Sequence, residues 1–380
     1  MSFWLIFFFY CLFLISFVGA HCLHLYIYFL EDPDKQLLNA CKNGTIRRVK
    51  RLLKKPNINP NYENRHGFTP FYLACSEGYI EIVKLLLNDS RIFFNKQSND
   101  GQTPFYIACK QERIDVVKLL LNDERIDVNS SGHLRCVTPF FVACQKGSIE
   151  VVQLLLDNER VDVNKALENG ITPISIACVN HHIEVVKLFI NNQRIDVNKA
   201  NKLGQAPLFI VCKNGDIEIL KLLLKDKRLD TSKSKMSQTP CHIACNQGRI
   251  EVLKYLLVYV SEVTLATKDK RGRTLIDIAR KCEKKFNWES EEDYQERKRN
   301  SEKMRELLES FERNRNKTKL ELRIQLDEAG TNFSLQLFSF NINQIFFAKY
   351  LKQNKMKDAI AAVCYATIVL LCDNYLKFQA

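Results

Sequence analysis

The sequence predicts an all-α protein: a solenoid of stacked helix-turn-helix units with short hairpin loops, a helical C-terminal cap and an N-terminal apolar helix. Two periodic features support the solenoid. A Thr-Pro pair, or a variant of it, recurs every 33 to 35 residues, and a cysteine follows six residues after each pair from Thr69 to Thr239. Such a period indicates modules that share one core with their neighbours. The periodic cysteines are Cys41, Cys75, Cys109, Cys144, Cys178, Cys212 and Cys245.

Each unit contains the signals for two short helices. Thr is a good N-cap and Pro suits the first helical position, so we expect the first helix to begin at pairs such as Thr69-Pro70. A glycine such as Gly78 ends it in the left-handed conformation. The run at residues 80–87 has apolar residues at helical spacing with Glu and Lys outside, which predicts the second helix. The following Arg-(Ile/Val)-Asp-Val-Asn stretch, as at residues 125–129, predicts an extended linker and a turn.

The periodic cysteines are interpreted as small buried apolar residues. Stacked helices lie roughly 8–10 Å apart, whereas a disulfide needs Cα atoms closer than about 7 Å. We therefore expect no pairing between neighbouring units, which indicates a reducing compartment.

The pattern Gly-x-Thr-Pro-x-x-x-Ala-(Ala/Cys)-x-x-Gly-x-x-x-(Val/Ile)-Val-x-x-Leu-Leu resembles the ankyrin-repeat family, over about residues 34–281. The resemblance implies an ankyrin domain at residues 31–281, with about seven repeats and a partial last one. It also implies a non-catalytic scaffold or adaptor for a protein partner. The family often has His three residues after the Thr. Here only His242 keeps it, so we expect aromatic packing to replace that hydrogen bond elsewhere.

The resemblance places partner contacts at the hairpin tips and at the exposed end of each first helix. These positions vary between units while the framework repeats, as a recognition surface requires. Lys and Arg are frequent among them, which favours an acidic protein partner. The predicted partner-binding residues are Arg65, His66, Asn99, Asp100, Lys110, Gln111, Leu134, Arg135, Lys146, Glu168, Asn169, Lys202, Leu203, Lys213, Lys235 and Met236.

No catalytic signature occurs: the chain lacks a phosphate-binding glycine loop, Gly-x-Ser-x-Gly and His-Glu-x-x-His. Cys241, His242 and Cys245 resemble half of a zinc-binding site. They occupy repeat positions that we expect to be buried, so packing in the core explains them. The net charge of +13 fits nucleic acid, an anionic membrane or an acidic protein, and no nucleic-acid motif is present. We expect no enzyme activity, metal, cofactor, small-molecule substrate or nucleic-acid partner.

Residues 3–30 contain no Lys, Arg, Asp or Glu, and this length is sufficient to span a bilayer. Three interpretations of residues 1–30 stay open: a transmembrane anchor, a cleaved signal peptide, and an error in the predicted start of the gene. Seven cations follow between Lys42 and Lys55. With an anchor, the positive-inside rule predicts cytoplasmic repeats.

Beyond the repeats, residues 282–330 are dense in both charge signs, with a partial apolar face that includes Leu308 and Leu322. We expect one or two amphipathic helices that cap the exposed end of the stack, as solenoids require. Residues 331–380 form a separate C-terminal segment, in which residues 359–372 are a short apolar helix candidate.

Overall fold

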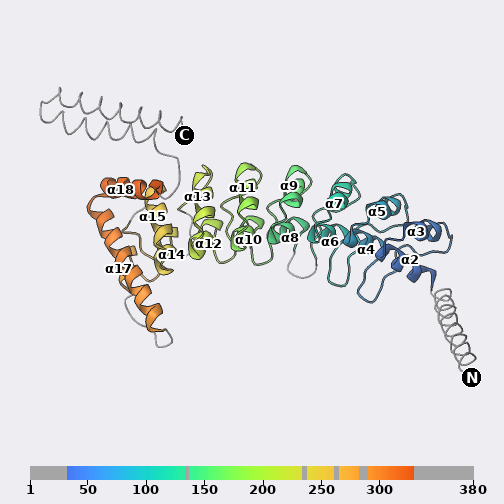
Figure 1. Cartoon of the computed structure of the whole chain (residues 1–380), viewed down its shortest axis with the longest axis horizontal. Helices are drawn as coiled ribbons and strands as arrows, with labels where there is room; N and C mark the ends of the chain where they lie inside the picture. Colours follow the sequence, from blue (N-terminus) through green and yellow to red (C-terminus); the bar gives the residue numbers. More distant parts are fainter. Residues whose placement is uncertain (1–31, 133–136, 233–237, 261–264, 282–289, 329–380) are drawn as a thin grey trace, which may run out of the picture.

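The computed structural model describes residues 32–132, 137–232, 238–260, 265–281 and 290–328. The expected helices at residues 1–30 and 359–372 lie outside these ranges. Within them every regular element is a helix, and the helices form one elongated row closed at one end by α17 and α18 (Figure 1). The helices are α2 (Pro33–Lys42), α3 (Ile46–Leu53), α4 (Pro70–Glu77), α5 (Ile80–Leu87), α6 (Pro104–Lys110), α7 (Ile114–Leu121), α8 (Pro139–Lys146), α9 (Ile149–Asp157), α10 (Pro173–Val179), α11 (Ile183–Asn191), α12 (Pro207–Asn214), α13 (Ile217–Lys225), α14 (Pro240–Asn246), α15 (Ile250–Tyr259), α16 (Leu275–Lys281), α17 (Glu291–Arg313) and α18 (Arg315–Glu328).

The first helix of each complete repeat begins where the sequence predicts. In α4, the Thr69 hydroxyl oxygen accepts a hydrogen bond from the backbone N–H of Tyr72 at 3.1 Å, and Pro70 occupies the first helical position. Thr103, Thr138 and Thr172 cap α6, α8 and α10 in the same way. The proline removes an N–H that would have no partner in the first turn.

The predicted glycine at the end of the first helix is found in the left-handed region, but two repeats depart from this rule. Gly78 and Gly147 have φ of 85° and 78°. At the same repeat position, Glu112 (φ 55°) and His181 (φ 60°) adopt the left-handed conformation with a side chain. A Cβ atom is disfavoured there, so these two turns carry backbone strain.

One continuous apolar core runs from Leu37 in the first repeat to Leu326 in α18. First helices pack in succession from α2 to α16, and second helices pack in a parallel row from α3 to α15. The seven periodic cysteines are free and fully buried, as predicted. Burial raises the pKa of the Cys41 thiol to about 12 and that of Cys75 well above its ordinary value. These thiols therefore stay neutral and act as packing groups.

The linkers between repeats are held by a series of asparagine side chains that the sequence did not reveal. The Asn129 amide donates to the Arg160 carbonyl at 2.7 Å, and its oxygen accepts from the Asp162 N–H at 2.8 Å. Each bridge therefore joins one linker to the equivalent linker of the next repeat. We call this series the asparagine bridges. Its members are Asn61, Asn95, Asn129, Asn164 and Asn198.

The arginine that opens each linker caps the preceding repeat. The Arg160 guanidinium donates to the carbonyls of Leu121, Asp123 and Ile126. These carbonyls lie at and just after the end of α7, where backbone acceptors have no partner within the helix. The Arg-(Ile/Val)-Asp-Val-Asn stretch is thus a connection between repeats as well as an extended linker.

The described part of residues 282–330 forms the predicted cap. Helix α17 packs on α16, and α18 packs on α15 and α17. Leu308 and Phe311 of α17 and Leu322 and Leu326 of α18 are buried in the common core. The first turns of α17 extend past the row of helices, as Figure 1 shows.

Candidate partner-binding surface

The hairpin tips are tight turns that project from one side of the stack. Successive tips are joined by backbone hydrogen bonds, from the Asn99 N–H to the His66 carbonyl and from the Lys202 N–H to the Asn169 carbonyl, both 3.0 Å. Of the predicted tip residues, Arg65, His66, Asn99, Asp100, Glu168, Asn169, Lys202 and Leu203 are exposed. Leu134, Arg135, Lys235 and Met236 lie outside the described residues.

The predicted residues of the first helices lie at the helix ends. Lys110 is half-buried at the end of α6, and Gln111 is exposed and donates its N–H to the Ile107 carbonyl. Lys146 and Lys213 are exposed near the ends of α8 and α12. The tip and helix positions therefore follow one side of the row rather than converging on a single point. Lys213 alone among them lines the cavity described next.

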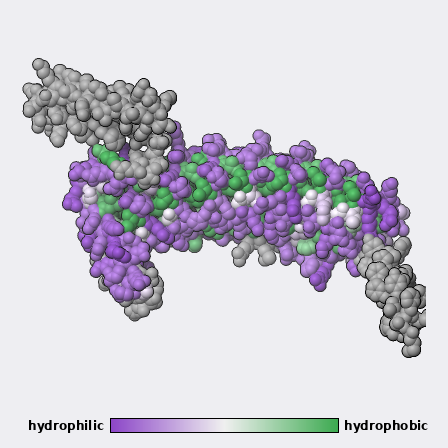
Figure 2. Space-filling view, in the orientation of Figure 1, coloured by the Kyte–Doolittle hydropathy of each residue, from purple (hydrophilic) through white to green (hydrophobic). Residues whose placement is uncertain are grey.

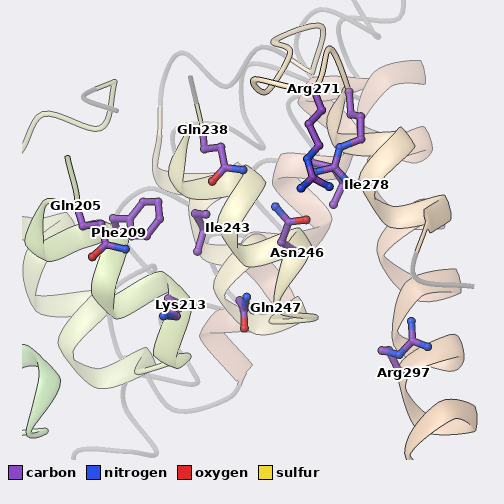
Figure 3. Close-up of a pocket in the computed structure, with 11 residues that line it drawn as sticks. Gln205, Phe209, Lys213, Gln238, Ile243, Asn246, Gln247, Arg271, Ile278 and Arg297 are labelled. Carbon is purple, nitrogen blue, oxygen red and sulfur yellow. The ribbon is translucent and has the colours of Figure 1, made fainter. Parts of the chain in front are cut away.

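A cavity of about 510 Å³ lies between residues of α12, α14, α16 and α17. Phe209, Ile243 and Ile278 give it an apolar part. In Figure 3, Arg297 from α17 lies across the cavity from Gln205 and Phe209. The full lining is Gln205, Phe209, Lys213, Gln238, Ile243, Asn246, Gln247, Arg271, Arg273, Ile278 and Arg297.

The cavity lining is cationic and amide-rich. Its charged residues are one lysine and three arginines, and no carboxylate lines it. The Arg273 guanidinium and backbone N–H groups hold the pKa of Asp269 at about 2, so Arg273 is already paired, at 2.6 Å. Within the described ranges, Lys213 and Arg271 form no ion pair. Their charges are therefore available to an anionic ligand.

Sequence reasoning missed several lining residues. Arg297 lies on a helix outside the repeats, and only tertiary packing brings it to the stack. Gln205 and Gln238 each precede the cap residue of a first helix, as Gln102 does in an earlier repeat. That recurrence was a usable signal, because these three glutamines hold the same repeat position and therefore border the same side of the row.

The three residues that resemble half of a zinc-binding site are part of the core, as the repeat predicts. Cys241, His242 and Cys245 are buried. His242 Nδ1 lies 2.8 Å from the Thr239 hydroxyl, and Nε2 lies 3.1 Å from the Thr267 carbonyl, so both ring nitrogens are engaged. In the described parts of the chain, no group of three or more His, Cys, Asp or Glu residues is placed to hold a metal ion.

None of the helices in the described ranges has the length and apolarity needed to cross a membrane. The candidate anchor, residues 3–30, is outside those ranges.

The fold defines a helical repeat protein, and the predicted partner-binding residues lie along one side of its stack. The profile of ankyrin repeats in three copies matches residues 37–132, 132–201 and 193–269, more than half of the 380-residue chain. The chain therefore belongs to the ankyrin-repeat family. Ankyrin repeats are general protein–protein interaction modules, and proteins built from them are typically non-enzymatic scaffolds. A comparison with curated proteins gives no significant match.

Proposed function

We propose that this protein is a non-catalytic adaptor that binds an acidic segment of a protein partner. The single observation that carries the proposal is the charge of the cavity between α12, α14, α16 and α17. Lys213, Arg271 and Arg297 line it together with amides and an apolar part, and no carboxylate does. Such a lining suits a peptide with carboxylates around an apolar side chain, because each group then has a complementary partner.

The hairpin tips extend this surface along the stack in the proposal. Exposed side chains such as Arg65, Lys202 and Leu203 add contacts beyond the cavity. Leu203 is 59% exposed and gives the tips an apolar contact. Variation among the tips sets which partner is preferred.

The proposal is tested by affinity capture with the full chain. The cavity variant carries Lys213→Glu and Arg271→Glu, both exposed positions. The control variant carries Lys84→Glu and Lys187→Glu. These exposed lysines lie on α5 and α11, the second helices of their repeats, and their substitution changes the net charge by the same amount. We expect the cavity variant to lose the proteins that the wild type and the control retain. Equal capture by all three chains would contradict the cavity as the binding site.

A membrane-tethered form of the same adaptor is the alternative. It rests on residues 3–30, which lack charged side chains. Carbonate extraction of the natural protein tests it: a tethered protein stays with the membranes at high pH. Complete release into the supernatant would leave the adaptor function and remove the tether.

A further inference from the structure

Helix α3 differs in charge from every other second helix of the stack. It carries four cations and no anion, in the sequence Ile-Arg-Arg-Val-Lys-Arg-Leu-Leu. The six equivalent helices, α5, α7, α9, α11, α13 and α15, have net charges between −2 and +1. Each of the six has a carboxylate at its second position, and α3 has Arg47 there. The repeats thus provide an internal comparison in which α3 alone is strongly cationic.

The excess of positive charge extends along the whole of α3 and into the turn after it. Arg48 and Arg51 stand where α5 has Ile82 and Leu85. Lys54 and Lys55 stand where the chain after α5 has Asn88 and Asp89. Burial and the neighbouring charge of Arg51 lower the pKa of Arg48, as expected where like charges are crowded.

These cations are directed to solvent over a wide face. Arg47, Lys50, Arg51, Lys54 and Lys55 are all exposed. Figure 2 shows a hydrophilic surface at this end of the stack and an apolar band along the row of helices. In the described residues of this repeat, the carboxylates are Asp32 and Asp34 near the start of α2 and Glu63 in the linker, which pairs with Lys96. None lies on α3.

The need for a soluble end cap does not explain the sign of this charge. A terminal repeat requires a polar outer face, and either sign of charge meets that need. The cap at the other end is mixed: α17 contains both Glu and Asp residues and Lys and Arg residues along its length. Helix α18 is mixed as well. The excess of positive charge is therefore a property of α3 and not a general property of the ends of the stack.

We propose that the exposed face of α3 binds the surface of an anionic membrane. A protein interface needs an apolar centre that excludes water, and the exposed residues of α3 are cations without apolar side chains among them. Mobile anionic headgroups need no such centre, because they gather under each cation. The apolar, charge-free residues 3–30 precede this repeat in the chain, which favours a lipid surface over nucleic acid.

The test uses sedimentation of the full chain with vesicles. One set is phosphatidylcholine alone, and the other contains phosphatidylserine as well. The α3 variant carries Arg47→Glu, Arg51→Glu and Lys54→Glu. Arg47→Glu restores the acidic residue type found at this position in the other six helices, so the fold should tolerate it. The control carries Lys84→Glu, Lys118→Glu and Lys187→Glu, which are exposed on α5, α7 and α11 and change the net charge equally.

We expect the wild type and the control to prefer the vesicles that contain phosphatidylserine. The α3 variant should lose at least about tenfold in binding to them, because three cations that attract anionic headgroups become anions that repel them. Circular dichroism checks that all three chains are folded. No preference of the wild type for anionic vesicles, or an equal loss in the control, would overturn the proposal. Tighter α3-dependent binding to duplex DNA than to vesicles would overturn it as well.

Discussion

At the scale of single residues, the linkers between repeats have a structural role that their sequence pattern did not indicate. Arg-(Ile/Val)-Asp-Val-Asn predicts an extended stretch before a turn, and its polar residues are exposed or half-buried. In the structure, Asn129 and Arg160 connect backbone groups of successive repeats. Backbone groups that have a protein partner in every repeat hold the row of helices in register.

The asparagine bridges should contribute to stability. Asn129→Ala removes two hydrogen bonds, one to the Arg160 carbonyl and one from the Asp162 N–H. We expect a loss of about 1–2 kcal/mol in the free energy of unfolding, measured by urea titration. Lys118→Ala, at an exposed position of α7, is the control and should change it by less than about 0.5 kcal/mol. Similar effects of both changes would show that the bridges contribute nothing.

For the strained turn at Glu112 we expect a substitution to stabilise the protein rather than destabilise it. Glu112 has φ of 55°, where glycine is found in five other repeats. Glu112→Gly should stabilise the protein by about 0.5–1 kcal/mol, because relief of strain exceeds the added entropy of the unfolded chain. The reverse test is Gly147→Ala, which would put a Cβ atom 2.5 Å from the His182 ring. A higher midpoint for the first variant and a lower one for the second, in thermal unfolding, are the expected results.

His242 should make the free energy of unfolding depend on pH, and substitution of this one residue can separate its contribution from those of other groups. The buried ring accepts from the Thr239 N–H at Nδ1 and donates to the Thr267 carbonyl from Nε2. Burial lowers the pKa of His242 in the folded protein. Its contribution is therefore complete above the ordinary histidine pKa of about 6.5 and is lost as pH falls through the lower folded pKa.

The matched variant for this prediction is His242→Phe, which places at this position the residue type of Phe141 and Phe209. Urea titrations of both proteins between pH 7.5 and about 4.5 provide the measurement. The wild type should lose more stability than the variant below about pH 6.5, because only the wild type must protonate this ring. Parallel pH profiles would mean that the His242 ring is not held in its neutral form.

At the scale of helices, the sequence determined the repeats far better than it determined the site. Starts such as Thr69-Pro70 are local signals, since the cap bond and the proline act within one turn. The cavity depends on where α17 lies, which distant apolar contacts such as those of Leu308 decide. Arg297 therefore could not be assigned to the site from the sequence, whereas Lys213 could, because its place follows from the repeat.

The cap should stabilise its own end of the stack. Leu308 is fully buried where α17 packs on α16. Leu308→Ala should cost about 2–4 kcal/mol through lost contacts and a cavity. Because each helix contacts only near neighbours, hydrogen exchange should accelerate in α15 and α16 and stay unchanged in α4 and α6. Lys303→Ala, at an exposed position of α17, should leave all four helices unchanged. Uniform acceleration along the chain would instead indicate one cooperative unit.

At the scale of the whole molecule, a stack of this kind separates its functions by distance. The cationic helix α3 belongs to the first repeat, and the cavity lies between the last repeats and α17. No helix that lines the cavity is α3 or packs against α3. The two proposed contacts should therefore be independent, since coupling between sites requires an element that both of them bias.

Deletion of one repeat tests both the stacking and this independence. Removal of residues 138–171 joins Val137 to Thr172, so the next first helix begins in the same register. We expect helicity per residue, measured by circular dichroism, to be retained, because the new neighbours have matching faces. Capture by the cavity and binding to anionic vesicles should also persist. Deletion of α8 alone is the control: it leaves α9 without its packing partner and should unfold the adjacent repeats. If the chain tolerated both deletions equally, the repeats would not be held by the stacking of complete two-helix units.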